Sequence, residues 1–180
     1  MIQNWTVEET LRHARHDFMN QLQLVKGNLD LDRVNTAKKI IDNIVLEAQK
    51  QSHLSALKSP QFTQWLLTYN WASHAIQLEY ELLELEMSTL IKVDDYFPWF
   101  SSFFQQLEEN VELLGENHAD LDISLEKEEC RFILDFQGII KDKNKMSDWL
   151  KQNTGGKGVQ LLVDTFTTHE ILLRFIVKSS

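Results

Sequence analysis

The spacing of apolar residues predicts a long helix near the start of the chain. From Leu11 onward, apolar residues recur three and four positions apart, which is the period of a helix with one apolar stripe. Thr6 as N-cap and Glu9 three residues later form a capping box, which predicts that this helix begins at Thr6. The stripe consists of Leu11, Ala14, Phe18, Leu22, Val25 and Leu29.

A turn and a second helix are expected to follow. The segment Gly27-Asn28-Leu29-Asp30 combines a glycine, an asparagine that tolerates a left-handed conformation and a capping aspartate. The first helix is therefore predicted to end near Gly27. The second helix keeps the same apolar spacing until about Leu57. Its stripe consists of Val34, Ala37, Ile41, Ile44 and Ala48.

A hairpin with one apolar stripe on each helix encloses little apolar surface by itself. Two hairpins that pair into a four-helix bundle would cover these stripes, so the pattern favours a homodimer. The alternative is that the hairpin packs against the rest of its own chain.

The pattern changes at Ser59-Pro60, where a new helix is expected with Ser59 as N-cap and Pro60 at its first position. Strict alternation predicts a strand over 76–82, and residues 121–125 and 130–136 are typical of a strand hairpin. Pro98 is expected to begin a helix that continues through Leu114. Short helices are predicted over 146–152 and 159–166, and a last strand over 169–177. The predicted fold class is α+β, with a helical hairpin over residues 1–58 and an α/β sandwich over 59–180.

Charge and composition narrow the classes of partner. The net charge of −9 arises in residues 58–180, which carry eleven Lys/Arg and twenty Asp/Glu, whereas residues 1–57 carry seven of each. An acidic second part argues against nucleic acid or an anionic membrane as a partner.

No apolar run could span a bilayer and no secretory signal is recognised, so we expect a cytoplasmic protein. Cys130 is the single cysteine, which excludes an intramolecular disulfide and a cysteine-based zinc cluster, and we expect it to be buried in a strand.

One histidine is distinguished by facing away from the apolar stripe. At about 100° per residue, His13, His16, Asn20, Gln23 and Gly27 form a second stripe that is entirely polar or small. An exposed imidazole such as that of His16 can act as a phosphoryl acceptor, a general base or a metal ligand.

These three chemistries make different demands on the surroundings of His16. A metal site with His13 lacks further ligands, because the side chain of Asp17 points about 100° round the helix. Hydrolytic catalysis needs a pocket, whereas a helix surface is convex. A convex histidine can accept a phosphoryl group when a second protein brings the pocket and the Mg²⁺ to it, since neutral imidazole is a competent nucleophile. Asp17 would then stabilise the charge on the ring, and Arg12 and Arg15 could meet an acidic protein surface.

His16 could instead be an ordinary solvated side chain, because surface histidines are common. The other histidines of the second helix and the α/β part are predicted to be structural, since each stands singly without a partner at a useful spacing. These are His53, His74, His118 and His169.

A family resemblance favours the phosphoryl acceptor. Residues 15–29 read Arg-His-Asp-Phe-Met-Asn-Gln-Leu-Gln-Leu-Val-Lys-Gly-Asn-Leu and closely resemble the phosphoacceptor helix of the sporulation initiation phosphotransferase B family. Citrate-type sensor kinases have a related histidine box, but the Leu-Val-Lys-Gly-Asn-Leu continuation is typical of the former. A weaker resemblance extends over the chain through Leu57-Lys58-Ser59-Pro60, Tyr69-Asn70-Trp71 and Leu78-Glu79-Tyr80-Glu81.

The resemblance implies a homodimer with a four-helix bundle, to which each chain adds a domain similar to the ATP-binding domain of histidine kinases but without kinase activity. It implies that His16, with Asp17 as its acidic neighbour, takes a phosphoryl group from an aspartate of one response regulator. The group then passes to an aspartate of a second regulator in the initiation of sporulation. Asn20 stands where related kinases have a residue tied to dephosphorylation.

No cofactor or metal of its own is expected for such a protein, because the partner response regulator supplies the Mg²⁺. The two regulators are expected to dock on the polar surface around His16. We assign that surface to Arg12, His13, Arg15, Asn20, Gln23 and Gly27.

A working ATP-dependent histidine kinase is the competing hypothesis, and a non-catalytic dimeric scaffold is the third. Asn110 resembles the asparagine box of kinases, and Gly155-Gly156-Lys157-Gly158-Val159 resembles their second glycine box. The first glycine box is represented at best by Asp135-Phe136-Gln137-Gly138, which has the wrong spacing and lacks a second glycine. The short segment between Gly138 and Gly155 leaves no room for a lid, so an adenine pocket is not expected.

Overall fold

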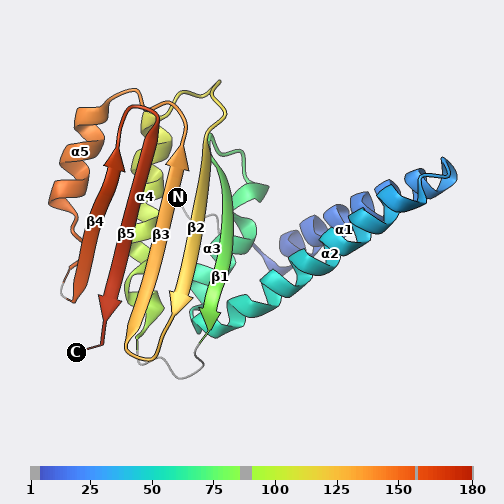
Figure 1. Cartoon of the computed structure of the whole chain (residues 1–180), viewed down its shortest axis with the longest axis horizontal. Coiled ribbons are helices and arrows are strands. Elements are labelled where there is room, and N and C mark those ends of the chain that lie inside the picture. The colour runs from blue at the N-terminus through green and yellow to red at the C-terminus, as the bar shows by residue number, and fades with distance from the viewer. Residues whose placement is uncertain (1–4, 86–90, 157, 180) are drawn as a thin grey trace. The chain divides into compact units, whose positions relative to one another are not determined.

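The first of two units is a helical hairpin. The structure is a computed structural model that describes residues 5–85, 91–156 and 158–179, and the chain divides into units over residues 2–53 and 54–180. In the first unit, α1 (Val7–Asp30) and α2 (Val34–His53) lie antiparallel to each other (Figure 1). The predicted capping box is confirmed, because the Thr6 hydroxyl accepts from Glu9 N–H and the Glu9 carboxylate accepts from Thr6 N–H.

The predicted end of the first helix near Gly27 is wrong. Helix α1 continues for three more residues, and the chain reverses at Asp32, which has a φ of 56°. The Asn28 side chain donates to Leu24 O at 2.8 Å, and Lys26 pairs with Asp30 at 2.9 Å. A glycine inside a helix costs roughly 1 kcal/mol. These contacts between successive turns offset that cost, so the backbone stays helical past Gly27.

The second unit is an α/β domain with a five-stranded sheet. Its strands are β1 (Gln77–Leu85), β2 (His118–Leu125), β3 (Glu129–Gln137), β4 (Val159–Phe166) and β5 (Glu170–Lys178). The strand order is β1-β2-β3-β5-β4; β1 and β2 are parallel, and the other neighbours are antiparallel. Three α-helices lie on one face of the sheet, and Figure 1 shows α4 running behind the strands. They are α3 (Pro60–Thr68), α4 (Phe97–Asn110) and α5 (Lys143–Gln152).

Short 3₁₀ turns connect these elements, at Leu54–Leu57, Tyr69–Trp71 and Val93–Asp95. The predicted start of α3 is confirmed, since Ser59 is the N-cap, accepts from Phe62 N–H at 3.2 Å, and precedes Pro60 at the first position. No helix in the described ranges combines the length and apolar character that crossing a bilayer requires.

The core of the α/β unit lies between the sheet and its helices and is rich in aromatic rings. Inward residues of β3 alternate with half-exposed ones, as the sequence pattern predicts, and Cys130 is buried among them. Burial and the nearby Glu129 carboxylate raise the pKa of the Cys130 thiol to about 12, so the thiol is a neutral packing group. Eight phenylalanines are fully buried: Phe62, Phe97, Phe100, Phe103, Phe104, Phe132, Phe136 and Phe175.

Two further predictions for this unit are wrong. Residues 159–166 form β4 and not a helix, because their backbone pairs with β5 along its length and their apolar residues fit a strand as well as a helix. The helix predicted to continue through Leu114 ends at Asn110. Beyond it, Val111 is extended and bridges Ile140, and Glu112 N–H donates to Ile139 O at 2.9 Å.

Candidate functional site

Helix α1 has three faces, and only one of them packs on α2. Its less exposed residues Thr10, Gln21, Val25 and Asn28 share the face toward α2, where Ala37 is buried. Apart from Val25, the predicted apolar stripe lies beside this face and is exposed within one chain. We call seven of the exposed apolar residues of the two helices the uncovered stripe: Leu11, Phe18, Leu22 and Leu29 of α1, with Val34, Ile41 and Val45 of α2.

His16 lies on the third face of α1, roughly 140° round the helix from the centre of the uncovered stripe. Its side chain is 72% exposed, and that of Asp17 is 54% exposed. The ring atom Nδ1 is 3.5 Å from Asp17 Oδ1 and 3.2 Å from Asn20 Nδ2. Both of these contacts are made by Nδ1, so Nε2 is the nitrogen left for an approaching group.

Most of the residues predicted to dock a partner surround His16 on exposed helix surface. Arg12, Arg15, Gln23 and Gly27 are all exposed. His13 differs, because it is half-buried and its ring lies edge-on to the Trp5 ring, with 4.7 Å between centroids. His13 thus lies at the border between the polar face of α1 and the segment that precedes the helix.

Comparison with known proteins decides the family. One family model, described as the alpha-helical domain of the sensor kinase SpoOB type, matches residues 2–57, and another, described as sporulation initiation phospho-transferase B, C-terminal, matches residues 58–178. Sporulation initiation phosphotransferase B of Bacillus subtilis (strain 168) is 34% identical over 166 residues, which cover 91% of this chain and 85% of that protein. The chain belongs to the sporulation initiation phosphotransferase B family. The resemblance predicted from residues 15–29 is confirmed.

Solved structures similar to this family member are histidine kinases. The catalytic domain of histidine kinase ThkA is 11% identical, with 64% of this chain and 86% of that chain covered and a TM-score of 0.44. The blue-light activated histidine kinase of Erythrobacter litoralis EL346 is 12% identical, with 99% and 62% covered and a TM-score of 0.42.

In this member of the phosphotransferase B family, the residues that resemble kinase motifs have structural contacts. The Asn110 amide donates to Asp142 O at 2.7 Å and accepts from Asp142 N–H at 3.1 Å, so both of its polar atoms bind backbone. Gly155 has a φ of +85°, and a Cβ there would come within 2.6 Å of the Phe175 ring. A Cβ on Gly138 would come within 2.6 Å of the Phe136 ring. These residues hold α5 and the turns beside it against the core.

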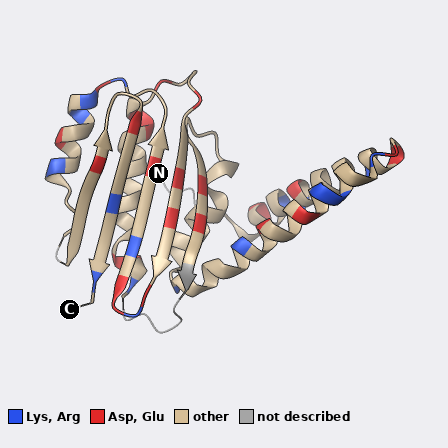
Figure 2. Cartoon of the chain, in the orientation of Figure 1, with Lys and Arg blue, Asp and Glu red and all other residues tan. Residues whose placement is uncertain are grey.

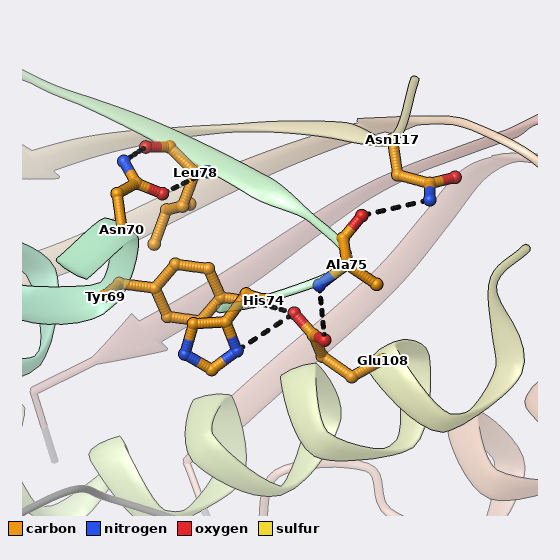
Figure 3. A network of polar contacts seen from close by, with 7 residues as sticks. All are labelled: Tyr69, Asn70, His74, Ala75, Leu78, Glu108 and Asn117. Carbon is orange, nitrogen blue, oxygen red and sulfur yellow. Dashed lines mark hydrogen bonds and ion pairs between the residues drawn. The ribbon is translucent and has the colours of Figure 1, made fainter. Parts of the chain in front are cut away.

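A polar network at the start of β1 was missed by sequence reasoning (Figure 3). Glu108 of α4 accepts from the Tyr69 hydroxyl at 2.5 Å and from Ala75 N–H at 2.9 Å, and it pairs with His74 Nδ1 at 3.2 Å. The His74 ring stacks on Tyr69, with 4.0 Å between centroids. His74 therefore has a partner 34 positions away, which no local spacing could reveal.

The charge state of Glu108 is set by this network. Burial alone would raise the pKa of Glu108, but the hydrogen bonds from His74, Tyr69 and the Ala75 N–H outweigh it and hold this pKa below its ordinary value. A carboxyl whose pKa is lowered by folding stabilises the folded state above its unfolded pKa, and this stabilisation disappears as the pH falls through the folded value. The network thus ties α4 to β1 at neutral pH.

We expect Glu108→Gln to lower the free energy of unfolding by about 1–3 kcal/mol at pH 7, because the amide replaces a hydrogen-bonded carboxylate. The difference from the wild type should shrink as the pH falls below about 4.5, the ordinary pKa of a glutamate. Urea denaturation between pH 7 and pH 3 measures both effects. Glu109→Gln, on the exposed side of the same helix, is the control and should change little. A difference that persists undiminished at pH 3 would contradict this account.

Proposed function

We propose that the chain is a cytoplasmic phosphorelay phosphotransferase in the initiation of sporulation. His16 takes a phosphoryl group from the aspartate of one response regulator and passes it to the aspartate of a second. The proposal rests on the imidazole of His16, which is exposed and whose Nδ1 is contacted by Asp17 and Asn20. The family membership supports the same reaction.

The transfer needs no proton to leave the ring. In the first step the lone pair of His16 Nε2 attacks the phosphorus of the aspartyl phosphate, the P–O bond breaks, and the aspartate carboxylate leaves with its electron pair. The ring then carries a positive charge and a proton on Nδ1. In the second step the carboxylate of the other regulator attacks the same phosphorus, the N–P bond breaks, and neutral imidazole is restored.

Asp17 favours the tautomer that this chemistry requires, and Asn20 can favour either tautomer. Nε2 is a nucleophile only when the proton is on Nδ1, and Asp17 Oδ1 lies 3.5 Å from Nδ1, where a carboxylate favours that tautomer and the later cation. The Asn20 amide reaches the same atom at 3.2 Å. With its oxygen turned toward the ring it accepts a hydrogen bond from Nδ1–H. With its nitrogen toward the ring, as the structure places it, the amide donates to Nδ1 and favours the other tautomer. Asn20 is therefore a positioning residue that can adjust the reactivity of Nε2.

The exposed face around His16 is the surface on which a regulator lands. Arg12 and Arg15 supply positive charge near the transferring phosphoryl group, and the regulator holds the Mg²⁺, so this chain contributes no metal site to the reaction. A glycine inside a helix costs about 1 kcal/mol, yet a Cβ at Gly27 would meet nothing within 4 Å in this chain. The absence of a side chain at Gly27 therefore suits the close approach of a partner. Gln23 lies between His16 and Gly27 along the helix, and His13 borders the same surface.

The functional form is a homodimer built from two hairpins. The uncovered stripe presents large apolar side chains such as Phe18, 53% exposed, and Leu22, 43% exposed. A contiguous apolar surface of this kind marks an interface, and a second hairpin would cover it in a four-helix bundle. Because the stripe and His16 occupy different faces of α1, dimerisation leaves the imidazole accessible.

The choice of phosphoryl donor tests the proposed function. We expect the full chain to acquire label from a regulator carrying radiolabelled aspartyl phosphate, and to acquire none from radiolabelled ATP with Mg²⁺. The Asn110 amide, which is bound to the backbone of Asp142, supports the second expectation. Label acquired from ATP alone would make the chain a histidine kinase. Label acquired from neither donor by a chain that still binds the regulator would make it a scaffold.

A further inference from the structure

Three potential metal ligands lie together on the face of the sheet opposite the helices. Glu79 belongs to β1, and His118 and Asp120 belong to β2, where they are two positions apart and so point to the same side. The two strands are parallel, and Glu79 is the direct partner of Asp120 in their register. We call these residues the β1–β2 triad. The backbone hydrogen bonds of two paired strands fix the positions from which its side chains project.

The distances within the triad suit a common cation. One ligand atom from each residue lies within 4.8 Å of the other two, and His118 Nε2 is 3.2 Å from Asp120 Oδ1. Two ligand atoms bound at about 2.1 Å to one divalent ion lie roughly 3.0–3.4 Å apart in octahedral or tetrahedral geometry. The His118–Asp120 pair already has this separation. The Glu79 carboxylate lies within 4.8 Å of both ligand atoms, and its side chain is exposed, so a rotation of that side chain would bring it to the same ion.

The charges around the triad point independently to a cation. On this face Glu79 is directly opposite Asp120, and the next pair along the two strands is Glu81 with Asp122. Like charges directly opposite each other destabilise a sheet. In the described ranges of the chain, no lysine or arginine lies within ion-pair distance of these four carboxylates, and Figure 2 shows red bands side by side on β1 and β2. Two successive acidic pairs at a sheet edge are the electrostatic setting that a bound cation relieves.

We propose that Glu79, His118 and Asp120 form a binding site for one divalent transition-metal cation, with Zn²⁺ as its representative. Imidazole nitrogen as a ligand favours Zn²⁺ over Mg²⁺, which prefers oxygen ligands. Three protein ligands leave the remaining positions of the ion to water. The site ties the edge strand β1 to β2, and it is separate from the His16 chemistry, which needs no metal from this chain.

A titration with Zn²⁺ that reports on individual histidines tests this site. The full chain, labelled with ¹⁵N, is followed by two-dimensional NMR of its imidazole nitrogens while Zn²⁺ is added in a non-coordinating buffer. We expect the His118 nitrogens to shift and saturate with one bound ion. Asp120→Asn should weaken this binding by more than about tenfold, since loss of even an outer-shell partner typically costs that much.

Two controls separate chelation from general attraction to acidic surface. Glu81→Gln removes a charge from the same face without removing a ligand and should weaken the binding by less than about threefold, a Coulomb effect screened by water. His169→Ala, an exposed histidine elsewhere, should leave the His118 shifts unchanged. Mg²⁺ at the same concentration should not shift His118. Equal weakening by Glu81→Gln and Asp120→Asn, or His118 signals that do not respond to millimolar Zn²⁺, would overturn the proposal.

Discussion

Leu22→Asp is expected to convert the proposed homodimer into monomers. Leu22 is at the middle of the uncovered stripe on α1 and is 43% exposed within its own chain. In a twofold-symmetric bundle the substitution occurs twice. Each copy forfeits about 2 kcal/mol of apolar burial and places a carboxylate in the seam without a partner. We therefore expect the dissociation constant of the dimer to rise by at least about three orders of magnitude.

Sedimentation equilibrium of the full chain measures this effect directly. Gln23→Glu is the matched control, because it introduces a negative charge at the next position of the same helix but on the polar face. That variant should sediment as the wild-type dimer. A Leu22→Asp protein that remains dimeric at micromolar concentration would show that another surface joins the two chains.

The boundaries that sequence could predict are those fixed by contacts between near neighbours. The capping box of Thr6 with Glu9, and Ser59 before Pro60, satisfy the N–H groups of a helix start within one turn, so residue type and spacing suffice. The end of α1 could not be predicted in this way. Gly27 is tolerated there because side chains on adjacent turns offset its cost, and the reversal occurs at Asp32 instead.

Elements that depend on distant parts of the chain were harder to predict. The apolar residues of 159–166 fit either period, and the pairing of β4 with β5 selects the strand. The same limit applies to the side-chain clusters. His74 pairs with Glu108, 34 positions away, because the segment before β1 lies beside α4, and Glu79 comes near His118 only because β1 and β2 pair in parallel register. His118 also pairs with Asp120, which is only two positions away, so the expectation that His118 has no partner at a useful spacing is wrong.

The candidate site at His16 was predictable because helical phase alone determines which residues share a face. The polar stripe predicted that His16 is exposed, and the structure places its side chain in solvent. The phase did not reveal that His13 contacts Trp5, because that contact involves the segment before the helix. It also did not show that both neighbours of His16 approach the same ring nitrogen, which depends on side-chain conformation.

We propose that His16 carries the phosphoryl group between two regulators. The most direct measurement is the rate of label transfer from a phosphorylated first regulator to a second one in the presence of the wild-type chain, His16→Ala or His53→Ala. His53 is an exposed histidine at the end of α2 and serves as the control. We predict wild-type rates with His53→Ala and a loss of at least about three orders of magnitude with His16→Ala, because the nucleophile itself is removed. Transfer that survives in a folded, dimeric His16→Ala protein would contradict the assignment of His16 as the phosphoryl acceptor.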